Sequence, residues 1–302
     1  MKKLSNLEKL ECDLFKNKEV SFFVKRDDEI HPTVSGNKYR KLLYLIKHLK
    51  SKNVKKIITF GGAYSNHIHA SSYAFRENGI RSIGIIRGEE LKNKKRNSTL
   101  SFAEKNGMEL IFVTREEYKK RNNPEYINYL SEKYNAFIVP EGGTSCFAKQ
   151  GLIDMVDEVN NDIVVDYFAC ATGSAGTVAG INAGLLKNQT VLSFPVVKNI
   201  SGDVKKTIKS FSKKNQYRVI EGYEFGGYGK YSDELIKFID WFEKKFKIEI
   251  EQVYTGKVLF ALFDMIKKNY FNGKRVCFVH TGGLQGKLKN NLKNIDDFLF
   301  CC

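Results

Sequence analysis

The chain has 302 residues, of which 42% are hydrophobic and 28% charged, and these values are typical of a folded globular protein. It contains no run of about 18 apolar residues, so we expect no membrane-spanning helix. The formal net charge is +16, but lysine outnumbers arginine about four to one. Because arginine is favoured for bidentate contacts with phosphates and bases, we interpret the charge as a solvated surface and do not expect nucleic acid as a partner.

The cysteines and the first residues indicate a cytoplasmic protein. Residues 1–8 turn polar and acidic too soon for a secretory signal. The six cysteines show neither a metal-binding spacing nor a disulfide pattern: Cys12, Cys146, Cys170, Cys277, Cys301 and Cys302. Reduced thiols in the cytoplasm, with no bound metal, are the simplest interpretation.

Strands and helices alternate from residue 20 onward, and this order predicts an α/β protein with parallel sheets. Periodicity and turn residues predict strands at 20–26, 56–60, 82–86, 109–113, 136–140, 163–169, 191–195 and 275–280. The same criteria predict helices at 39–50, 68–78, 98–105, 115–134, 148–160, 204–213, 232–245 and 258–269.

The first candidate for chemistry is Lys38, which lies where the turn Ser35-Gly36-Asn37 enters a helix. Burial and the positive N-terminal end of a helix both lower the pKa of an ammonium group. A neutral amine can attack a carbonyl and hold an aldehyde cofactor as a Schiff base. The alternative is one more solvated lysine, which is the usual role of this residue type.

The second candidate is the segment after the strand at 163–169, which opens a helix. Its glycines let backbone amides converge on an anion, and the helix N-terminus adds a favourable partial charge. We expect this segment to bind a phosphate group, and its alternative is a tight strand-to-helix turn. It consists of Thr172, Gly173, Ser174, Ala175, Gly176 and Thr177.

A third candidate, Ser65-Asn66-His67, lies at another junction between a strand and a helix. Helix amides and the Ser65 hydroxyl can bind a carboxylate, Asn66 can bond a phenolate oxygen, and His67 can transfer protons. The alternative makes Ser65 a simple N-cap and His67 a packing residue.

Further hydroxyl groups lie on loops near the expected strand ends, where α/β sheets bind their ligands. These are Tyr228, Tyr254, Thr255 and Thr281, for which packing is the alternative role.

Five segments occur together and in order: 35–41, 61–67, 172–180, 253–257 and 280–283. The set resembles the 1-aminocyclopropane-1-carboxylate deaminase / D-cysteine desulfhydrase family of pyridoxal-phosphate enzymes. The resemblance implies the two-domain, three-layer parallel-sheet fold of tryptophan synthase β (fold type II). It implies a large cofactor-binding domain from residues 1–42 and 144–302, an inserted small α/β domain at 43–143, and a cofactor in the cleft between them.

The resemblance also assigns roles. Lys38 would form the Schiff base, Asn66 would contact the ring oxygen of the cofactor, and Ser65 the substrate carboxylate. The segment Thr172 to Thr177 would hold the phosphate, with Thr281 also in the cofactor site. Thr255 would face the pyridine nitrogen, and Tyr228 and Tyr254 would form an active-site pair.

Two residues bear on the substrate. Deaminases of this family usually have glutamine at the position of His67 and glutamate at that of Thr255, so this chain resembles the desulfhydrases. We therefore expect β-elimination from a small D-amino acid such as D-cysteine, giving pyruvate, sulfide and ammonia. The resemblance alone also implies a homodimer. Tyr64 and His69 depart from the family pattern. The alternatives are a cyclopropane-carboxylate deaminase, another small-amino-acid lyase or racemase, and a non-catalytic protein that binds polyanions.

Overall fold

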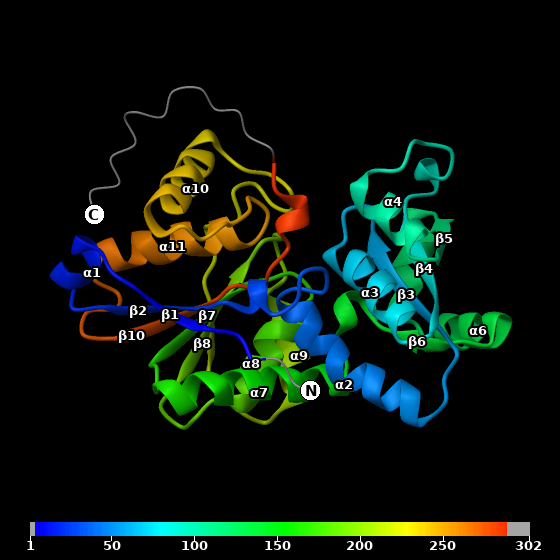
Figure 1. Ribbon diagram of the computed structural model, residues 1–302, viewed down its shortest axis with the longest axis horizontal. Helices are drawn as coiled ribbons and strands as arrows, with labels where there is room; N and C mark the ends of the chain where they lie inside the picture. Colours follow the sequence, from blue (N-terminus) through cyan, green and yellow to red (C-terminus); the bar gives the residue numbers. More distant parts are fainter. Residues whose placement is uncertain (1–3, 289–302) are drawn as a thin grey trace. The chain divides into compact units, whose positions relative to one another are not determined.

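The computed structural model describes residues 4–288, which form two compact units (Figure 1). The terminal unit combines the chain up to Ile30 with the chain from Leu152 onward, and the inserted unit comprises His31–Gly151. These bounds differ from the predicted domain limits at 42/43 and 143/144. Residues 31–42 group with the inserted unit because α2, Asn37–Ser51, is one continuous helix whose apolar face packs in that unit.

The terminal unit contains a six-stranded sheet of order β1-β2-β10-β7-β8-β9, in which only the pair β1 and β2 is antiparallel. Its strands are β1 Leu7–Leu10, β2 Ser21–Lys25, β7 Tyr167–Thr172, β8 Thr190–Pro195, β9 Tyr217–Val219 and β10 Arg275–Val279. Its helices are α1 Asp13–Asn17, α8 Gly176–Gly184, α9 Ser201–Phe211, α10 Asp233–Phe246 and α11 Thr255–Lys267. Helix α7, Cys146–Asp162, begins in the inserted unit and ends in this one.

Both faces of this sheet are covered, so its parallel strands are apolar on both sides. Ala169 and Ala171 of β7 face a core that includes residues of α1, α10 and α11, whereas Phe168 and Cys170 face one that includes α7, α8 and α9. Figure 1 shows these two helical layers on opposite sides of the strands. The chain segments that directly follow β7 and β10 carry predicted site residues.

The inserted unit contains a parallel four-stranded sheet of order β5-β4-β3-β6. Its strands are β3 Lys56–Gly62, β4 Arg81–Arg87, β5 Met108–Val113 and β6 Phe137–Val139. Besides α2, its helices are α3 Asn66–Glu77, α4 Ser98–Lys105, α5 Arg115–Lys119 and α6 Pro124–Tyr134. Helices α2, α3 and α4 contribute to two apolar clusters of this unit, and α5 and α6 contribute to a third.

The prediction of α/β architecture with parallel sheets is confirmed, and most predicted elements are present. The strand predicted at 163–169 begins only at Tyr167, and β1, α1 and β9 were not predicted. The helical segment predicted at 115–134 is two helices, because Pro124 lacks the N–H needed to continue the first helix and instead starts the second. Short 3-10 turns lie at Asp27–Glu29, Glu89–Leu91, Lys120–Asn122, Glu141–Gly143 and Leu284–Gly286.

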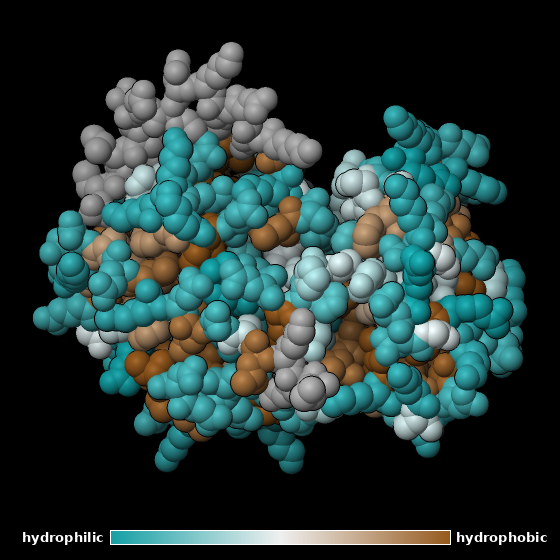
Figure 2. All heavy atoms as spheres, in the orientation of Figure 1, coloured by the Kyte–Doolittle hydropathy of each residue, from teal (hydrophilic) through white to brown (hydrophobic). Residues whose placement is uncertain are grey.

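None of the helices between residues 4 and 288 has the length and hydrophobicity required to cross a bilayer. On the face shown in Figure 2, hydrophilic side chains cover most of each unit and hydrophobic ones appear in small areas between them.

Candidate active site

Lys38 lies in the first turn of α2, directly after the sharp turn at Gly36. Gly36 has φ 64° and ψ −146°, a conformation that favours glycine, and it sets the direction in which the helix starts. The Lys38 side chain is partly buried, and within its unit the described residues give its amine no hydrogen bond or ion pair. Burial lowers the pKa of this amine to about 8, against the opposing effect of Glu141. The amine is therefore more nucleophilic at neutral pH than that of a surface lysine.

Ser65 and Asn66 lie at the N-terminus of α3, directly after β3. Ser65 is the N-cap, and its hydroxyl accepts a hydrogen bond from the amide of Ile68 at 3.3 Å. Gly61 makes this turn possible, since a Cβ at that position would lie 2.8 Å from Ser65 Oγ and 2.4 Å from Ile68 Cγ1. The structure thus shows the capping role of Ser65, and its role toward a substrate carboxylate stays a prediction.

His67 is buried between two hydroxyl groups. Its Nε2 lies 2.7 Å from Thr59 Oγ1, and its Nδ1 lies 3.2 Å from Ser71 Oγ. Thr59 Oγ1 donates its hydrogen to the carbonyl of Val139 at 3.0 Å, so it accepts from His67, and Nε2 carries the ring proton. Burial and the positive charges of Lys38 and Lys41 hold the pKa of His67 well below its usual value.

The structure shows His67 buried and hydrogen-bonded at both ring nitrogens, and its role in proton transfer stays a prediction. His67 also contacts the loop before α7, because a Cβ at Gly143 would lie 3.3 Å from His67 Cε1. His67 therefore holds β3, α3 and that loop together close to Lys38.

Replacing Thr59 by valine tests this network. Valine has the same shape but leaves His67 Nε2–H buried without its acceptor and removes the hydroxyl's bond to the Val139 carbonyl. We expect a loss of roughly 2–4 kcal/mol in the free energy of unfolding, measured by urea titration. Ser71→Ala, which removes the longer bond, should cost about 1 kcal/mol. Equal small losses in both variants would contradict the larger contribution expected of Thr59 to this network.

In the terminal unit, the predicted phosphate-binding segment connects β7 to α8. Ala175 is the N-cap of α8 with φ 59°, a left-handed conformation that turns the chain sharply into the helix. Thr172 is buried, and its hydroxyl is 2.8 Å from Ser193 Oγ of β8, whereas Ser174 is exposed. Thr172 thus joins β7 to β8, and Ser174 and the first amides of α8 are the groups of this turn best placed to contact a phosphate.

The structure brings Tyr228 and Tyr254 together. Their ring centroids are 5.9 Å apart with an interplanar angle of 73°. A Cβ at Gly173 would lie 3.5 Å from the Tyr254 ring, so Tyr254 also packs beside the phosphate-binding segment. Three parts of the predicted site in the terminal unit therefore lie in contact.

Thr255 is fully buried at the start of α11. Its hydroxyl is 3.1 Å from the carboxylate of Glu251, and it accepts a hydrogen bond from the Glu251 amide at 2.9 Å. The hydroxyl thus has partners inside the unit, and its predicted role at the pyridine nitrogen stays a prediction.

Glu251 is a residue that the sequence analysis did not single out. Its carboxylate accepts hydrogen bonds from the amides of Val253, Tyr254 and Thr255, at 2.6, 2.9 and 2.7 Å. Burial raises the pKa of Glu251, and these hydrogen bonds partly oppose the rise. An acidic residue just before a helix was the available signal, because carboxylates favour helix N-termini. With this cap, α11 begins at Thr255 rather than at the predicted Val258.

Thr281 follows β10 and is buried. The chain turns there through Gly282 and Gly283, which have φ 71° and 92°. His280 fixes the turn, since its Nδ1 accepts from the Gly282 amide at 3.2 Å and its Nε2 donates to the Glu249 carbonyl at 2.7 Å. The position of Thr281 at the end of a central strand agrees with a binding role, which stays a prediction.

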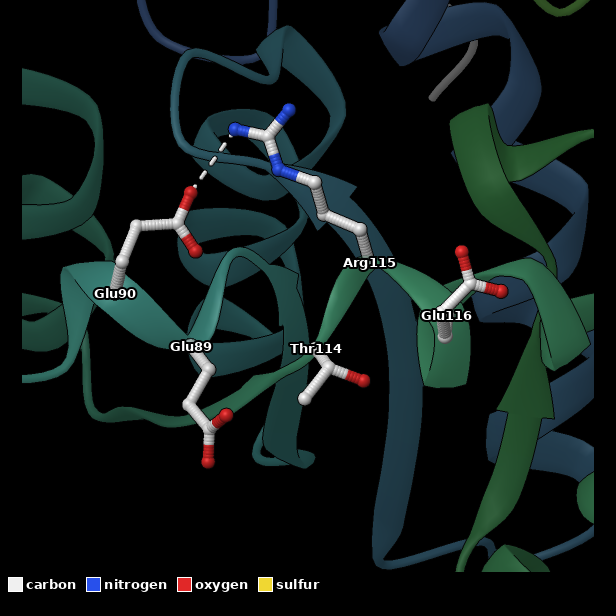
Figure 3. A pocket seen from close by; sticks show the side chains of 5 residues that line it. All are labelled: Glu89, Glu90, Thr114, Arg115 and Glu116. Atoms are coloured by element: carbon white, nitrogen blue, oxygen red, sulfur yellow. Dashed lines mark hydrogen bonds and ion pairs between the residues drawn. The ribbon is translucent and has the colours of Figure 1, made fainter.

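A surface hollow of about 510 Å³ lies elsewhere on the inserted unit (Figure 3). It is lined by Glu89, Glu90, Thr114, Arg115 and Glu116, none of which is a predicted site residue. Arg115 forms an exposed ion pair with Glu90 at 3.0 Å, which contributes little stability.

Comparison with known proteins gives consistent matches over nearly the whole chain. The family model described as pyridoxal-phosphate dependent enzyme matches residues 5–282. A Pyrococcus furiosus protein named putative 1-aminocyclopropane-1-carboxylate deaminase is 32% identical over 290 residues, covering 87% of this chain and 85% of that protein. An Arabidopsis thaliana protein named bifunctional D-cysteine desulfhydrase/1-aminocyclopropane-1-carboxylate deaminase, mitochondrial, is 27% identical and covers 87% of this chain and 72% of that protein.

One solved structure, described as an ACC deaminase homologue, is similar over 94% of this chain and 90% of its own. Its TM-score is 0.80 at 25% sequence identity. The likeness therefore extends to the tertiary structure.

Proposed function

Because the chain belongs to the family of pyridoxal-phosphate-dependent enzymes, we propose that it is a lyase that acts on D-cysteine or a similar small D-amino acid. The reaction would consume water and release sulfide, pyruvate and ammonia. Membership confirms pyridoxal phosphate as the cofactor and the predicted fold class of tryptophan synthase β.

The residues present fit this cofactor. The observation that best supports this function is Lys38, a partly buried amine at the start of a helix whose pKa is lowered to about 8. Lys38 would hold the aldehyde carbon of the cofactor, Asn66 its ring oxygen, and the turn from Thr172 to Thr177 its phosphate. When bound, the cofactor supplies an electron-withdrawing ring that stabilises negative charge on the substrate.

The chain's own groups would bind the substrate and move the proton. Ser65 and the first amides of α3 would bind the substrate carboxylate, as helix N-termini favour anions. Lys38, a tyrosine of the pair Tyr228 and Tyr254, or both would accept the proton from the α-carbon. The amine of Lys38 suits this task because its pKa is close to the working pH.

The identity of residues 67 and 255 supports elimination of thiolate over opening of a cyclopropane ring. A threonine at 255 provides no charge of its own to keep a pyridine nitrogen protonated, and this weakens the electron sink. A weak sink suffices for a good leaving group such as thiolate. The name of the Arabidopsis relative includes both activities, so the deaminase is the second candidate.

A substrate panel tests the proposal. Purified holoenzyme would be assayed for sulfide release from D-cysteine and L-cysteine, and for 2-oxobutyrate from 1-aminocyclopropane-1-carboxylate. We expect sulfide from D-cysteine to exceed both other signals. A larger 2-oxobutyrate signal would make the chain a deaminase, and no product from any substrate would overturn the proposal. We further propose a homodimer in the cytoplasm, which light scattering and cell fractionation would test.

The pKa of Lys38 predicts how fast the cofactor attaches. With a pKa of about 8, roughly one tenth of the amine is neutral at pH 7. Below the pKa, this neutral fraction grows about tenfold for each unit by which the pH rises. The rate at which the apo-chain takes up pyridoxal phosphate, followed by stopped-flow absorbance, should rise up to about pH 8 and then level off. A rise that continues to about pH 10, as in a free lysine model compound, would contradict the lowered pKa.

A further inference from the structure

The loop at residues 222–231, here called the tyrosine loop, is fastened along one face of α11. The hydroxyl of Tyr223 donates to Asp264 Oδ2 at 2.5 Å. Phe225 packs edge-on against Phe260, with ring centroids 5.2 Å apart. These two contacts hold the first part of the loop.

A third contact holds the part of the loop next to Tyr228. The ammonium of Lys257 donates to the carbonyl of Glu224 at 2.8 Å and to that of Gly227 at 2.9 Å. Lys257 is 1% exposed, so the whole side chain lies beneath the loop. The three anchor positions on α11 are spaced by three and four residues, which places them on one helical face.

The tyrosine loop needs such anchors because its backbone is intrinsically flexible. Glycine has the largest conformational entropy to lose, so a glycine-rich loop is ordered only where contacts offset that loss. Left-handed φ values occur at Phe225, Gly226, Gly227 and Gly229. A hydrogen bond from a charged donor is stronger than a neutral one, and Lys257 provides two of them at the glycine-rich end.

Burying the ammonium of Lys257 costs free energy, and within residues 4–288 no carboxylate forms a salt bridge with it. Burial lowers its pKa to about 8, while the carboxylates of Glu251 and Glu224 act in the opposite direction. A buried charge requires hydrogen-bond partners, and both partners of this ammonium are carbonyls of the tyrosine loop. Lys257 therefore contributes to the order of the loop as well as to the packing of α11. Its position ties the backbone before Tyr228 to the helix whose N-cap is Tyr254.

We propose that Lys257 is a positioning residue that holds Tyr228 beside Tyr254 through the backbone of the tyrosine loop. The inference rests on the proposed function, in that it takes these two tyrosines as groups of the active site. With the loop released, the Tyr228 hydroxyl would sample many positions, and a displacement of about 1 Å already reduces catalysis strongly.

Lys257→Met tests the proposal, since methionine keeps the apolar stem and removes the donors. Hydrogen exchange of the apo-chain, followed by mass spectrometry, should show amides 227–231 exchanging about tenfold faster or more, with α10 unchanged. In the holoenzyme, kcat should fall about tenfold or more while KM and the cofactor affinity change less than about threefold.

Tyr223→Phe is the matched control, because it removes a different anchor of the same loop. It should speed exchange near residue 223 and leave kcat within about twofold of the wild type. Should Lys257→Met fail to fold, Lys257→Gln retains a neutral donor and should show smaller changes in the same direction.

The readouts separate this inference from the proposed function. Unchanged exchange at 227–231 in the folded variant overturns the anchoring, whatever the substrate. Faster exchange with unchanged kcat overturns the link to catalysis. A wild type that is inactive on every substrate overturns the proposed function. In that case hydrogen exchange and cofactor affinity still test whether Lys257 anchors the tyrosine loop.

Discussion

Replacing Lys38 by alanine is expected to lower kcat by about a thousandfold or more and to abolish the visible absorbance of the bound cofactor. The amine is the group proposed to hold the cofactor and to accept the α-proton, so one substitution removes both functions. Steady-state kinetics and the absorption spectrum after dialysis measure the two effects.

Lys50→Ala is the control, because Lys50 is an exposed lysine on the same helix. It should keep the activity and spectrum of the wild type. A Lys38→Ala variant that retains a dialysis-resistant visible band would show that the cofactor is attached elsewhere. A colourless wild type that cannot be reconstituted would contradict the proposed function itself.

Replacing Glu251 by alanine is expected to give the largest loss of stability. Its carboxylate accepts from three consecutive amides and lies 3.1 Å from the Thr255 hydroxyl, and the residue is 1% exposed. Each buried donor left without a partner costs about 1–3 kcal/mol. Removing the carboxylate also removes the free-energy cost of its burial, which offsets part of this loss. We therefore expect a net loss of roughly 3–5 kcal/mol in the free energy of unfolding.

Urea titration followed by circular dichroism measures this loss, and kcat should fall as well because Tyr254 starts the uncapped helix. Glu249→Ala is the matched control, since Glu249 is exposed and lies two residues away. It should stay within about 0.5 kcal/mol of the wild type. A loss that small in Glu251→Ala would show that the amides find other acceptors.

The sequence alone determined the kind of fold and the main candidate. Apolar runs indicate strands and helical periodicity indicates helices, and both patterns are local. The α/β order and the parallel sheets were therefore predictable. Lys38 was identifiable because a small turn, a lysine and a helix follow one another in the chain. The order of five short segments then indicated the family.

Local signals were weaker where neighbours far along the chain decide the outcome. β1 and β9 are short edge strands, and β9 has only three residues, too few to show a period of two. The unit boundary at Ile30 follows from how α2 packs, which periodicity cannot show.

Only the tertiary structure decided the state of the groups behind the site. His67 is neutral because burial and the charges of Lys38 and Lys41 lower its pKa. Its tautomer follows from Thr59, whose hydroxyl is in turn bonded to the Val139 carbonyl, 80 residues away in the chain. Lys257 is a buried donor to carbonyls about 30 residues earlier in the chain. Burial and hydrogen-bond partners set these pKa values and positions, and both depend on segments that meet only after folding.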